Sequence, residues 1–372
     1  MKYRFDEIAI NSTAKKKPGD ADRAHYIGLE HIDSECLTIT RWGSDVTPAG
    51  EKLVMKKGDV LFGKRRAYQR KVGIAPFDGI FSAHGLVLRP NTKIVDSEFF
   101  PFFISSDQFM ERAVRISVGG LSPTINWKDL KEQEFNLPPI AEQKVLAEKL
   151  WAAYRLKESY KKLLTSTQEM VKSQFIEMFG TSESNEKGWK ICSFGEKFSI
   201  TSGGTPNTQI EEYWNGNISW IGSNCCQNCI LTENDGKYIT EEGFNHCSAK
   251  MYKPDTILVA LVGATIGKVA YLKFDTCTNQ NVAGIEIKNR TEFEPMFIYY
   301  LLQNMYQRFF MLGMGKFKMA SLGFIKSLPL MIPPMELQQR FVSIAEQADK
   351  SGFELRKSIE AIDKVIKSLI NS

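Results

Sequence analysis

The stretch Leu137-Pro-Pro-Ile-Ala-Glu-Gln143 recurs 195 positions later as Ile332-Pro-Pro-Met-Glu-Leu-Gln338. Three further landmarks repeat in the same order, with offsets between 194 and 197. They pair Tyr26-Ile-Gly28 with Trp220-Ile-Gly222, Lys57-Gly-Asp-Val-Leu61 with Lys253-Pro-Asp-Thr-Ile257, and Phe77-Asp78 with Phe274-Asp275. A nearly constant offset over several landmarks is typical of an internal duplication. The sequence therefore predicts two copies of one unit.

Each Pro-Pro pair is followed by a long segment without proline, for which we predict a long helix. Proline suits a first helical turn because its missing N–H costs nothing there. Gly180 tolerates the left-handed backbone and is expected to end the first helix. Apolar residues alternate at spacings of three and four, which is the a/d pattern of a coiled coil. The seam consists of Leu146, Leu150, Tyr160, Leu164 and Val171 in the first copy and Phe341, Leu355, Ile359, Ile362 and Ile366 in the second.

A helix of about 35 to 40 residues is roughly 55 Å long. A helix of this length with so narrow an apolar stripe needs a partner against which the stripe can pack. We expect the two helices to pair with each other. The alternative is that each helix lies on its own domain.

The segments before the helices contain short β-rich runs separated by Gly, Pro, Asp and Asn, and each also has an aromatic stretch at helical spacing, Phe99–Val114 and Pro295–Met311. We therefore predict an α+β protein in which two globular domains alternate with two long helices. The expected bounds are 1–136 for the first domain, 137–180 for the first helix, 181–188 for a polar linker, 189–331 for the second domain and 332–372 for the second helix.

Composition is that of a soluble globular protein: 372 residues, 43% hydrophobic and 24% charged, which is enough for about two domains. No secretory signal is visible, and no apolar run approaches the ~20 residues of a membrane span. The seven cysteines do not resemble a disulfide framework. We expect a cytoplasmic protein without membrane contact. The net charge of +5 is compatible with a polyanion partner but decides nothing alone.

Motifs of catalysis are missing from the sequence. An adenine methyltransferase would show Asn or Asp before Pro-Pro and an aromatic residue after it, but Leu137 and Ile332 stand there instead. Gly263-Ala-Thr-Ile-Gly267-Lys-Val269 is one residue shorter than a phosphate loop and lacks the Ser or Thr that binds magnesium. It is better interpreted as a glycine turn between strands. The four histidines show no triad pattern, so we expect no catalytic residues.

A partial zinc spacing exists in the second copy, where Cys226 and Cys229 are followed by His246 and Cys247. The first copy repeats the same landmarks without these cysteines. We therefore predict no metal site, although the spacing alone leaves the question open.

A basic loop directly after the predicted strand Val60–Phe62 is the strongest candidate for DNA contact. Arginine can read guanine or clamp a phosphate, glutamine can pair with adenine, and lysine neutralises the backbone. The alternative is a solvated basic hairpin. The candidate residues are Lys64, Arg65, Arg66, Tyr68, Gln69, Arg70 and Lys71, with Lys268, Lys316 and Lys318 as a weaker counterpart in the second copy. The glycine-loosened segments 117–126 and 311–315 suit either DNA contact or an ordinary connection.

The pattern resembles the DNA-specificity (S) subunit of type I restriction-modification systems. The resemblance spans nearly the whole chain and is carried by both Pro-Pro-x-x-x-Gln helix starts, by Gly58–Leu61 and by Pro254–Ala270. Ser202-Gly-Gly-Thr-Pro206, Tyr213-Trp214, Ile218–Ile221 and Thr278-Asn-Gln280 carry it further. The first copy departs from it, because it lacks the Gly-Gly-Thr-Pro and Asn-Gln signatures.

The resemblance implies two target recognition domains, each reading one half of a bipartite, asymmetric site in double-stranded DNA. It implies that the two helices pair antiparallel as a ruler, with an internal pseudo-twofold, and that they dock two modification (methyltransferase) subunits. It adds Thr205, Asn279 and Gln280 to the DNA-contacting candidates. Such a subunit is non-catalytic and has no cofactor, because S-adenosylmethionine, ATP and magnesium belong to partner subunits.

The sequence leaves open whether restriction subunits join the complex and which bases are read. A non-DNA-binding adaptor that organises protein partners through its coiled coil is the alternative function.

Overall fold

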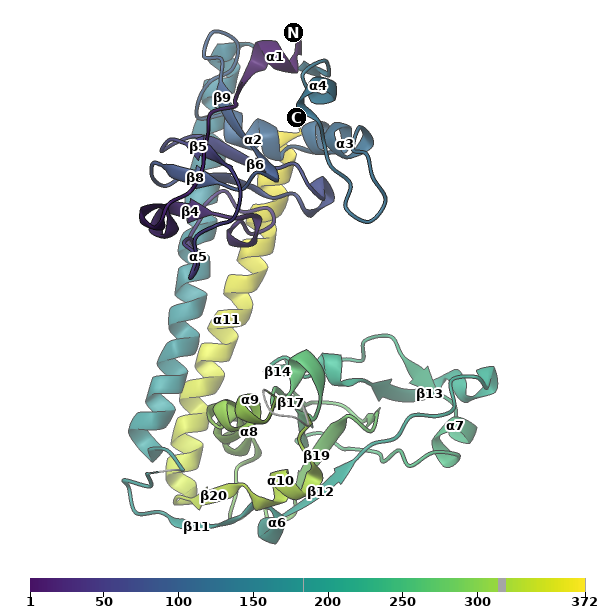
Figure 1. The fold of residues 1–372 in the computed structure, drawn as a ribbon. Helices are drawn as coiled ribbons and strands as arrows, with labels where there is room; N and C mark the ends of the chain where they lie inside the picture. The colour runs from purple at the N-terminus through teal and green to yellow at the C-terminus, as the bar shows by residue number, and fades with distance from the viewer. Residues whose placement is uncertain (183, 314–318, 372) are drawn as a thin grey trace. The chain divides into compact units, whose positions relative to one another are not determined.

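The computed structural model describes residues 1–182, 184–313 and 319–371, which form two compact units (Figure 1). Unit 1 comprises Met1–Lys162 and Leu355–Ser372, and unit 2 comprises Leu163–Glu354. Each unit therefore holds one globular domain together with parts of both long helices. The division into recognition domains, helices and linker at the expected boundaries stays a prediction.

Unit 1 contains two four-stranded sheets, ordered β2-β9-β6-β7 and β3-β5-β8-β4, and a two-stranded sheet of β1 and β10. The strands are β1 (Lys2–Arg4), β2 (Ala9–Ser12), β3 (Lys15–Lys16), β4 (Tyr26–Ile27), β5 (Lys52–Met55), β6 (Val60–Gly63), β7 (Val72–Ile74), β8 (Gly79–Phe81), β9 (Gly85–Pro90) and β10 (Glu134–Asn136). The helices and 3-10 turns are α1 (Phe5–Ile8), η1 (Asp20–His25), η2 (Leu29–His31), η3 (Ala67–Gln69), α2 (Phe100–Ser105), α3 (Asp107–Arg115) and α4 (Trp127–Leu130).

Unit 2 contains a five-stranded sheet, β12-β19-β16-β17-β14, a three-stranded sheet, β15-β13-β18, and the pair β11-β20. Its strands are β11 (Lys190–Ser193), β12 (Phe198–Ser202), β13 (Trp214–Ile221), β14 (Cys229–Leu231), β15 (Tyr238–Ile239), β16 (Ile257–Ala260), β17 (Val269–Leu272), β18 (Cys277–Thr278), β19 (Val282–Ile287) and β20 (Pro329–Ile332). Its helices and turns are α6 (Phe194–Lys197), η4 (Glu211–Tyr213), η5 (Ser223–Cys225), α7 (Glu241–Asn245), η6 (Gly263–Thr265), α8 (Pro295–Asn304), α9 (Tyr306–Gly313) and α10 (Leu322–Ser327).

The duplication extends to strand register. In unit 1, Val60 of β6 faces Leu88 of β9, and in unit 2, Ile257 of β16 faces Ile285 of β19. Both members of the pair are shifted by 197 positions, so Val60 corresponds to Ile257, one residue away from the sequence-based pairing of Leu61 with Ile257. Because a slip of one residue would turn every side chain to the opposite face, equal registers mean that both sheets present equivalent faces. The two copies share one α+β fold.

The long helices are α5 (Ile140–Phe179) and α11 (Met335–Ile370). Gly180 has φ +73° and donates its N–H to the Ile176 carbonyl at 2.7 Å, so it ends α5 as expected. The segments expected to form one helix on each sheet instead form two. In unit 1 the break falls at Ser106, whose hydroxyl accepts the Phe109 N–H at 3.1 Å and begins α3.

The glutamine of the repeated signature is fully buried in both copies and joins each long helix to its domain. Gln143 accepts the N–H of Asp96 at 2.8 Å and donates to the carbonyls of Ile94 at 3.0 Å and Pro138 at 2.8 Å. Gln338 repeats all three bonds at 2.9, 3.0 and 2.9 Å, with Glu294, Glu292 and Pro333. An amide supplies both an acceptor and two donors, which explains why the signature requires glutamine at this position.

Each unit packs the start of one long helix against the end of the other. In unit 1, Leu150 of α5 shares a core with Ile366 of α11, and Lys157 forms an ion pair with Asp363. In unit 2, the aromatic rings of Phe175 and Phe341 have centroids 5.1 Å apart. The helices therefore run antiparallel.

The seam residues differ in burial. Leu150, Val171, Phe341 and Ile366 are buried, whereas Leu146, Tyr160, Leu164, Leu355, Ile359 and Ile362 are half-buried. The cores containing Leu150 and Phe341 are also the cores of the globular domains. The helices thus pair with each other and lie on the domains, which joins the two arrangements that the sequence presented as alternatives.

Candidate nucleic-acid interface

The basic loop connects β6 to β7 and is braced by the glycine-loosened segment 117–126. The Arg66 N–H donates to the Pro123 carbonyl at 2.7 Å, and the Ile125 N–H donates to the Lys64 carbonyl at 3.0 Å. Arg65 and Thr124 form an isolated antiparallel bridge. Two segments that the sequence treats separately therefore form one surface.

The tip of the loop presents the side chains best suited to DNA. Arg65 and Arg66 are exposed, and Tyr68 is 55% exposed. Arg66 is held in the left-handed region at φ +55°, and its Nε donates to the Ser122 hydroxyl at 3.2 Å. Non-glycine residues keep that conformation only where their surroundings hold it. The tip is therefore a fixed platform carrying two cations and an aromatic ring.

The other loop residues are less accessible. Lys64 is half-buried, and burial lowers the pKa of its ammonium, with a smaller contribution from the charge of Lys15. Gln69 is half-buried as well, and its carbonyl accepts a hydrogen bond from the Ser34 hydroxyl. Lys71 donates to the Leu29 carbonyl at 2.6 Å. Two of the seven candidate side chains, Arg65 and Arg66, thus supply most of the accessible charge.

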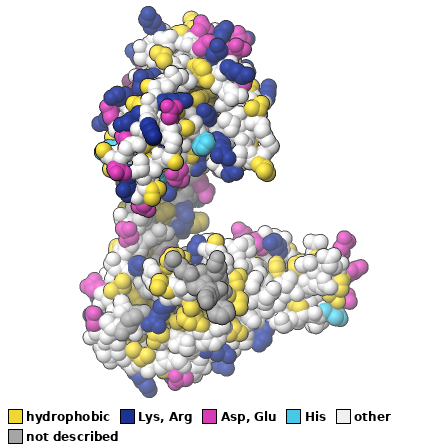
Figure 2. Space-filling view, in the orientation of Figure 1, with side chains coloured by type: hydrophobic (Ala, Val, Ile, Leu, Met, Phe, Trp, Pro, Cys, Tyr) yellow, Lys and Arg dark blue, Asp and Glu magenta, His cyan; other side chains and the backbone are white. Residues whose placement is uncertain are grey.

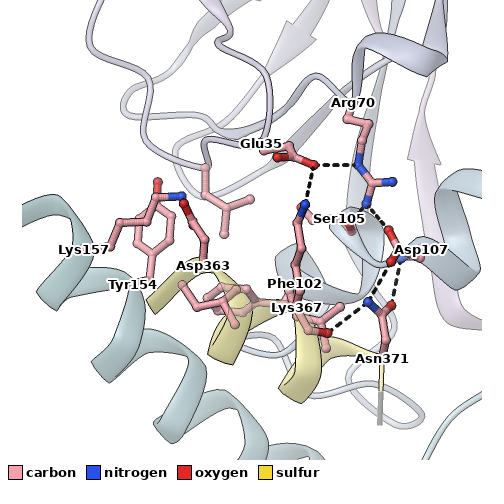
Figure 3. Close-up of a pocket in the computed structure, with 13 residues that line it drawn as sticks. Glu35, Arg70, Phe102, Ser105, Asp107, Tyr154, Lys157, Asp363, Lys367 and Asn371 are labelled. Atoms are coloured by element: carbon pink, nitrogen blue, oxygen red, sulfur yellow. Dashed lines mark hydrogen bonds and ion pairs between the residues drawn. The ribbon is translucent and has the colours of Figure 1, made fainter. Parts of the chain in front are cut away.

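The side chain of Arg70 points toward Glu35 and Asp107 within unit 1 (Figure 3). Its guanidinium donates to the carboxylate of Asp107 at 2.7 Å and to the Ser105 carbonyl at 2.9 Å, and lies 3.3 Å from Glu35. The sequence-based prediction of DNA contact treated all five cations alike, and the structure separates Arg70 from the tip.

The corresponding loop of unit 2 is a tight glycine turn. Gly263 and Gly267 have φ of +71° and +75°. A Cβ on Gly267 would lie 2.2 Å from the Cβ of Phe309, so only glycine fits. Lys268 donates to the Gln227 amide oxygen at 2.8 Å. Lys316 and Lys318 lie outside the described residues.

The Gly-Gly-Thr-Pro and Thr-Asn-Gln segments meet in space. Thr205 donates its hydroxyl to the Gln280 amide oxygen at 2.5 Å, across 75 positions of sequence. A Cβ on Gly203 would lie 2.0 Å from the Thr278 carbonyl oxygen, which explains the glycine. The half-buried Asn279 accepts the Asn281 N–H at 3.0 Å through its side-chain oxygen. Thr205 and Gln280 therefore form one polar group just beyond the end of β12 and before the start of β19, two neighbouring strands of the five-stranded sheet of unit 2.

The visible face of unit 1 mixes Lys and Arg with Asp and Glu (Figure 2). Such a surface does not attract a polyanion over its whole extent. Contact with DNA is therefore expected at specific loops.

The cysteines of unit 2 are free thiols, and Cys226 is buried. Burial, followed by the charge of Asp235, raises the pKa of the Cys225 thiol to about 11. Among the described residues, no group of three or more His, Cys, Asp or Glu side chains is placed to hold a metal ion. No helix in the described part of the chain is long and apolar enough to span a membrane.

Residues 8–166 and 186–363 match the family described as the type I restriction modification DNA specificity domain, and the chain therefore belongs to this family. Sequence-specific DNA targeting is the function that the family defines, and the match gives no support to a DNA-independent adaptor. The two matched segments also correspond to the internal duplication.

Relatives and solved structures agree with the family. The chain is 27% identical over 191 residues to the type I restriction enzyme MjaIX specificity subunit of Methanocaldococcus jannaschii, covering 50% of this chain and 44% of that protein. It is 24% identical over 397 aligned positions to the putative MjaX specificity subunit of the same organism, covering 98% of this chain and 89% of that protein. The chain thus spans less than half of the first relative and most of the second.

Two solved structures show the same fold. The type I restriction-modification S subunit from M. genitalium superimposes with a TM-score of 0.58 at 16% identity, covering 100% of this chain and 94% of that one. A chain from a study of assembly and conformational transition in a type I system superimposes with a TM-score of 0.57 at 18% identity, covering 100% and 96%.

Proposed function

We propose that this chain is the non-catalytic specificity subunit that directs type I modification subunits to a bipartite, asymmetric DNA site. Each unit reads one half-site. The observation that carries the proposal is a duplicated scaffold with unlike loops: the registers of β6 and β16 against their neighbours are equivalent, but Arg65 and Arg66 occur only in the first loop.

In unit 1, the exposed tip of Arg65, Arg66 and Tyr68 supplies two guanidinium groups and a ring. Arginine donates a planar pair of N–H groups that matches the O6 and N7 of guanine in the major groove, and it also clamps phosphate. In unit 2, Thr205 and Gln280 supply uncharged donors and acceptors. Halves read by such different chemistry have different sequences.

The helix pair is proposed to dock two modification subunits. Leu156, Leu163 and Met170 of α5 are 45%, 52% and 50% exposed and follow one another at seven-residue intervals. An exposed apolar stripe of this kind suits a helix from a partner protein. The partners are expected to carry the S-adenosylmethionine site, and restriction subunits, where present, the ATP and magnesium sites. The complex is expected to work in the cytoplasm.

The test is methylation sequencing of cells with and without the gene for this chain, with the modification subunits retained. We expect adenine methylation at one two-part motif that disappears with the gene. An unchanged methylation pattern would contradict the proposal. Purified chain that binds S-adenosylmethionine or cuts DNA unaided would contradict its non-catalytic part.

A further inference from the structure

We propose that Asn371 and Asp107 are positioning residues that tie the basic loop to the last turn of α11, so that reading of the first half-site depends on the C-terminal end of the second long helix. This inference rests on the proposed function.

Asn371 pairs with Asp107 at two points. The Asn371 side-chain oxygen accepts the backbone N–H of Asp107 at 2.9 Å, and its Nδ2 donates to the Asp107 carboxylate at 2.9 Å. The same Nδ2 donates to the Lys367 carbonyl at 3.0 Å, which fixes the side chain on the helix. This arrangement needs one acceptor and one donor on the same side chain, so an amide fits and a carboxylate does not.

Asp107 also binds the basic loop, through Arg70. Its second oxygen accepts from Arg70 Nη2 at 2.7 Å. A parallel connection runs through Glu35, which lies 3.3 Å from Arg70 Nε and 3.6 Å from Lys367 Nζ. Two carboxylates therefore link Arg70 to the last turn of α11 (Figure 3).

Arg70 in turn holds the loop in shape. Its backbone lies in the left-handed region at φ +50°, and its N–H closes the η3 turn on the Ala67 carbonyl at 2.8 Å. The Arg70 carbonyl accepts the Glu35 N–H at 3.3 Å. Because a non-glycine residue adopts this backbone only when its surroundings hold it, loss of the side-chain attachment is expected to release the turn that carries Arg66 and Tyr68.

Packing beneath the network is incomplete. A cavity of about 60 Å³ lies there, with Leu37, Phe102, Tyr154 and Ile366 in its wall. The side chains of Arg70, Glu35 and Asp107 remain 26%, 47% and 45% exposed, so a single pair contributes little. The fixed distance between loop and helix therefore depends on the paired hydrogen bonds acting together.

Among the residues of unit 2 that the structure describes, no counterpart of this attachment is present. Gly267 stands two residues before β17, as Arg70 stands two residues before β7. Its turn is held by backbone bonds and by Phe309 instead. Any effect of Asn371 on DNA recognition should thus be confined to the first half-site.

The experiment uses the full-length chain assembled with its modification subunits and duplexes carrying the motif found by methylation sequencing. The half-site whose discrimination is lost in the double variant Arg65→Ala, Arg66→Ala is assigned to unit 1. Binding is then compared for duplexes with base changes in either half-site. Ser368→Ala, on the same exposed turn of α11, is the matched control, and circular dichroism reports folding.

We expect Asn371→Ala to weaken binding about tenfold and to reduce discrimination at the first half-site alone, since both hydrogen bonds between Asn371 and Asp107 are lost. Asn371→Asp should weaken binding further, because it places a second carboxylate next to the carboxylate of Asp107. Exchanging the two groups, Asp107→Asn with Asn371→Asp, restores a donor and an acceptor and should recover binding relative to Asn371→Asp.

Three results would overturn the inference: unchanged discrimination in Asn371→Ala, equal losses at both half-sites, or no recovery in the exchange variant while it remains folded. The proposed function fails separately, when the wild-type complex selects no motif at all.

Discussion

Replacing Gln143 by alanine should destabilise unit 1 more than any surface change on the same helix. Gln143 is 0% exposed and makes three hydrogen bonds, to the Asp96 N–H and to the Ile94 and Pro138 carbonyls. Alanine leaves the Asp96 N–H and the Ile94 and Pro138 carbonyls without this partner at a position where the wild-type side chain is fully buried. A buried polar group left unpaired costs about 1–3 kcal/mol. Because each carbonyl retains a second lone pair, we expect a loss on the order of 3–5 kcal/mol in the free energy of unfolding.

Urea unfolding of the full-length chain, followed by circular dichroism, measures this loss. Gln168→Ala is the control, because Gln168 lies on α5 and is exposed. Gln338→Ala should reproduce the loss within about 1 kcal/mol in unit 2, since its three bonds are equivalent. Gln143→Glu should be less stable than wild type at neutral pH and regain stability as the pH falls, because only the protonated carboxyl can donate to a carbonyl.

A loss below about 1 kcal/mol in Gln143→Ala, or one equal to that of the control, would contradict this prediction. It would mean that the glutamine does not fasten the helix to the domain. The signature would then need another explanation.

Three further outcomes are expected. The double variant Arg65→Ala, Arg66→Ala should weaken duplex binding by the assembled complex and reduce the slope of log affinity against log salt by about 2. Fluorescence anisotropy between 50 and 200 mM salt measures this slope. An unchanged slope would show that both side chains stay in solvent. Gln280→Ala should relax base discrimination in the other half-site only, with no change of salt slope, as measured on half-site variant duplexes. Burial opposes ionisation of Asp255, but hydrogen bonds from Tyr271 and Arg290 hold its pKa below the ordinary 3.8. The ionised carboxylate therefore stabilises the fold above pH 3.8, and this stabilisation is lost as the pH falls through the folded-state pKa. Asp255→Asn should be less stable than wild type at pH 7 and should lose less stability on acidification. Parallel pH profiles of the two proteins in thermal unfolding would contradict this.

The duplication and the two long helices could be predicted because their signals are local and repeated. Leu137–Gln143 and Ile332–Gln338 share spacing, and the a/d pattern needs no knowledge of distant partners. The break at Ser106 was missed because apolar periodicity continues through it. The only local signal of the break is a single residue, the serine cap that begins α3.

The site could be predicted only in part. The basic loop stands out as a charge run, but the run does not reveal which cations face solvent. Arg70 turns inward because of Asp107, 37 positions away, and Asn371, 264 positions beyond Asp107, and no local signal links the three. The contact of Thr205 with Gln280 depends on strand pairing in the same way. Glu35, Asp107 and Asn371 were missed for this reason.

Selection from a pool of randomised duplexes by the purified complex tests most directly the claim that one chain holds two unlike readers. The enriched motif should have two unlike halves separated by a fixed gap. In the double variant Arg65→Ala, Arg66→Ala, one half should be lost from the motif and the other should remain intact. A palindromic motif, a single continuous motif, or loss of both halves together in the variant would contradict it.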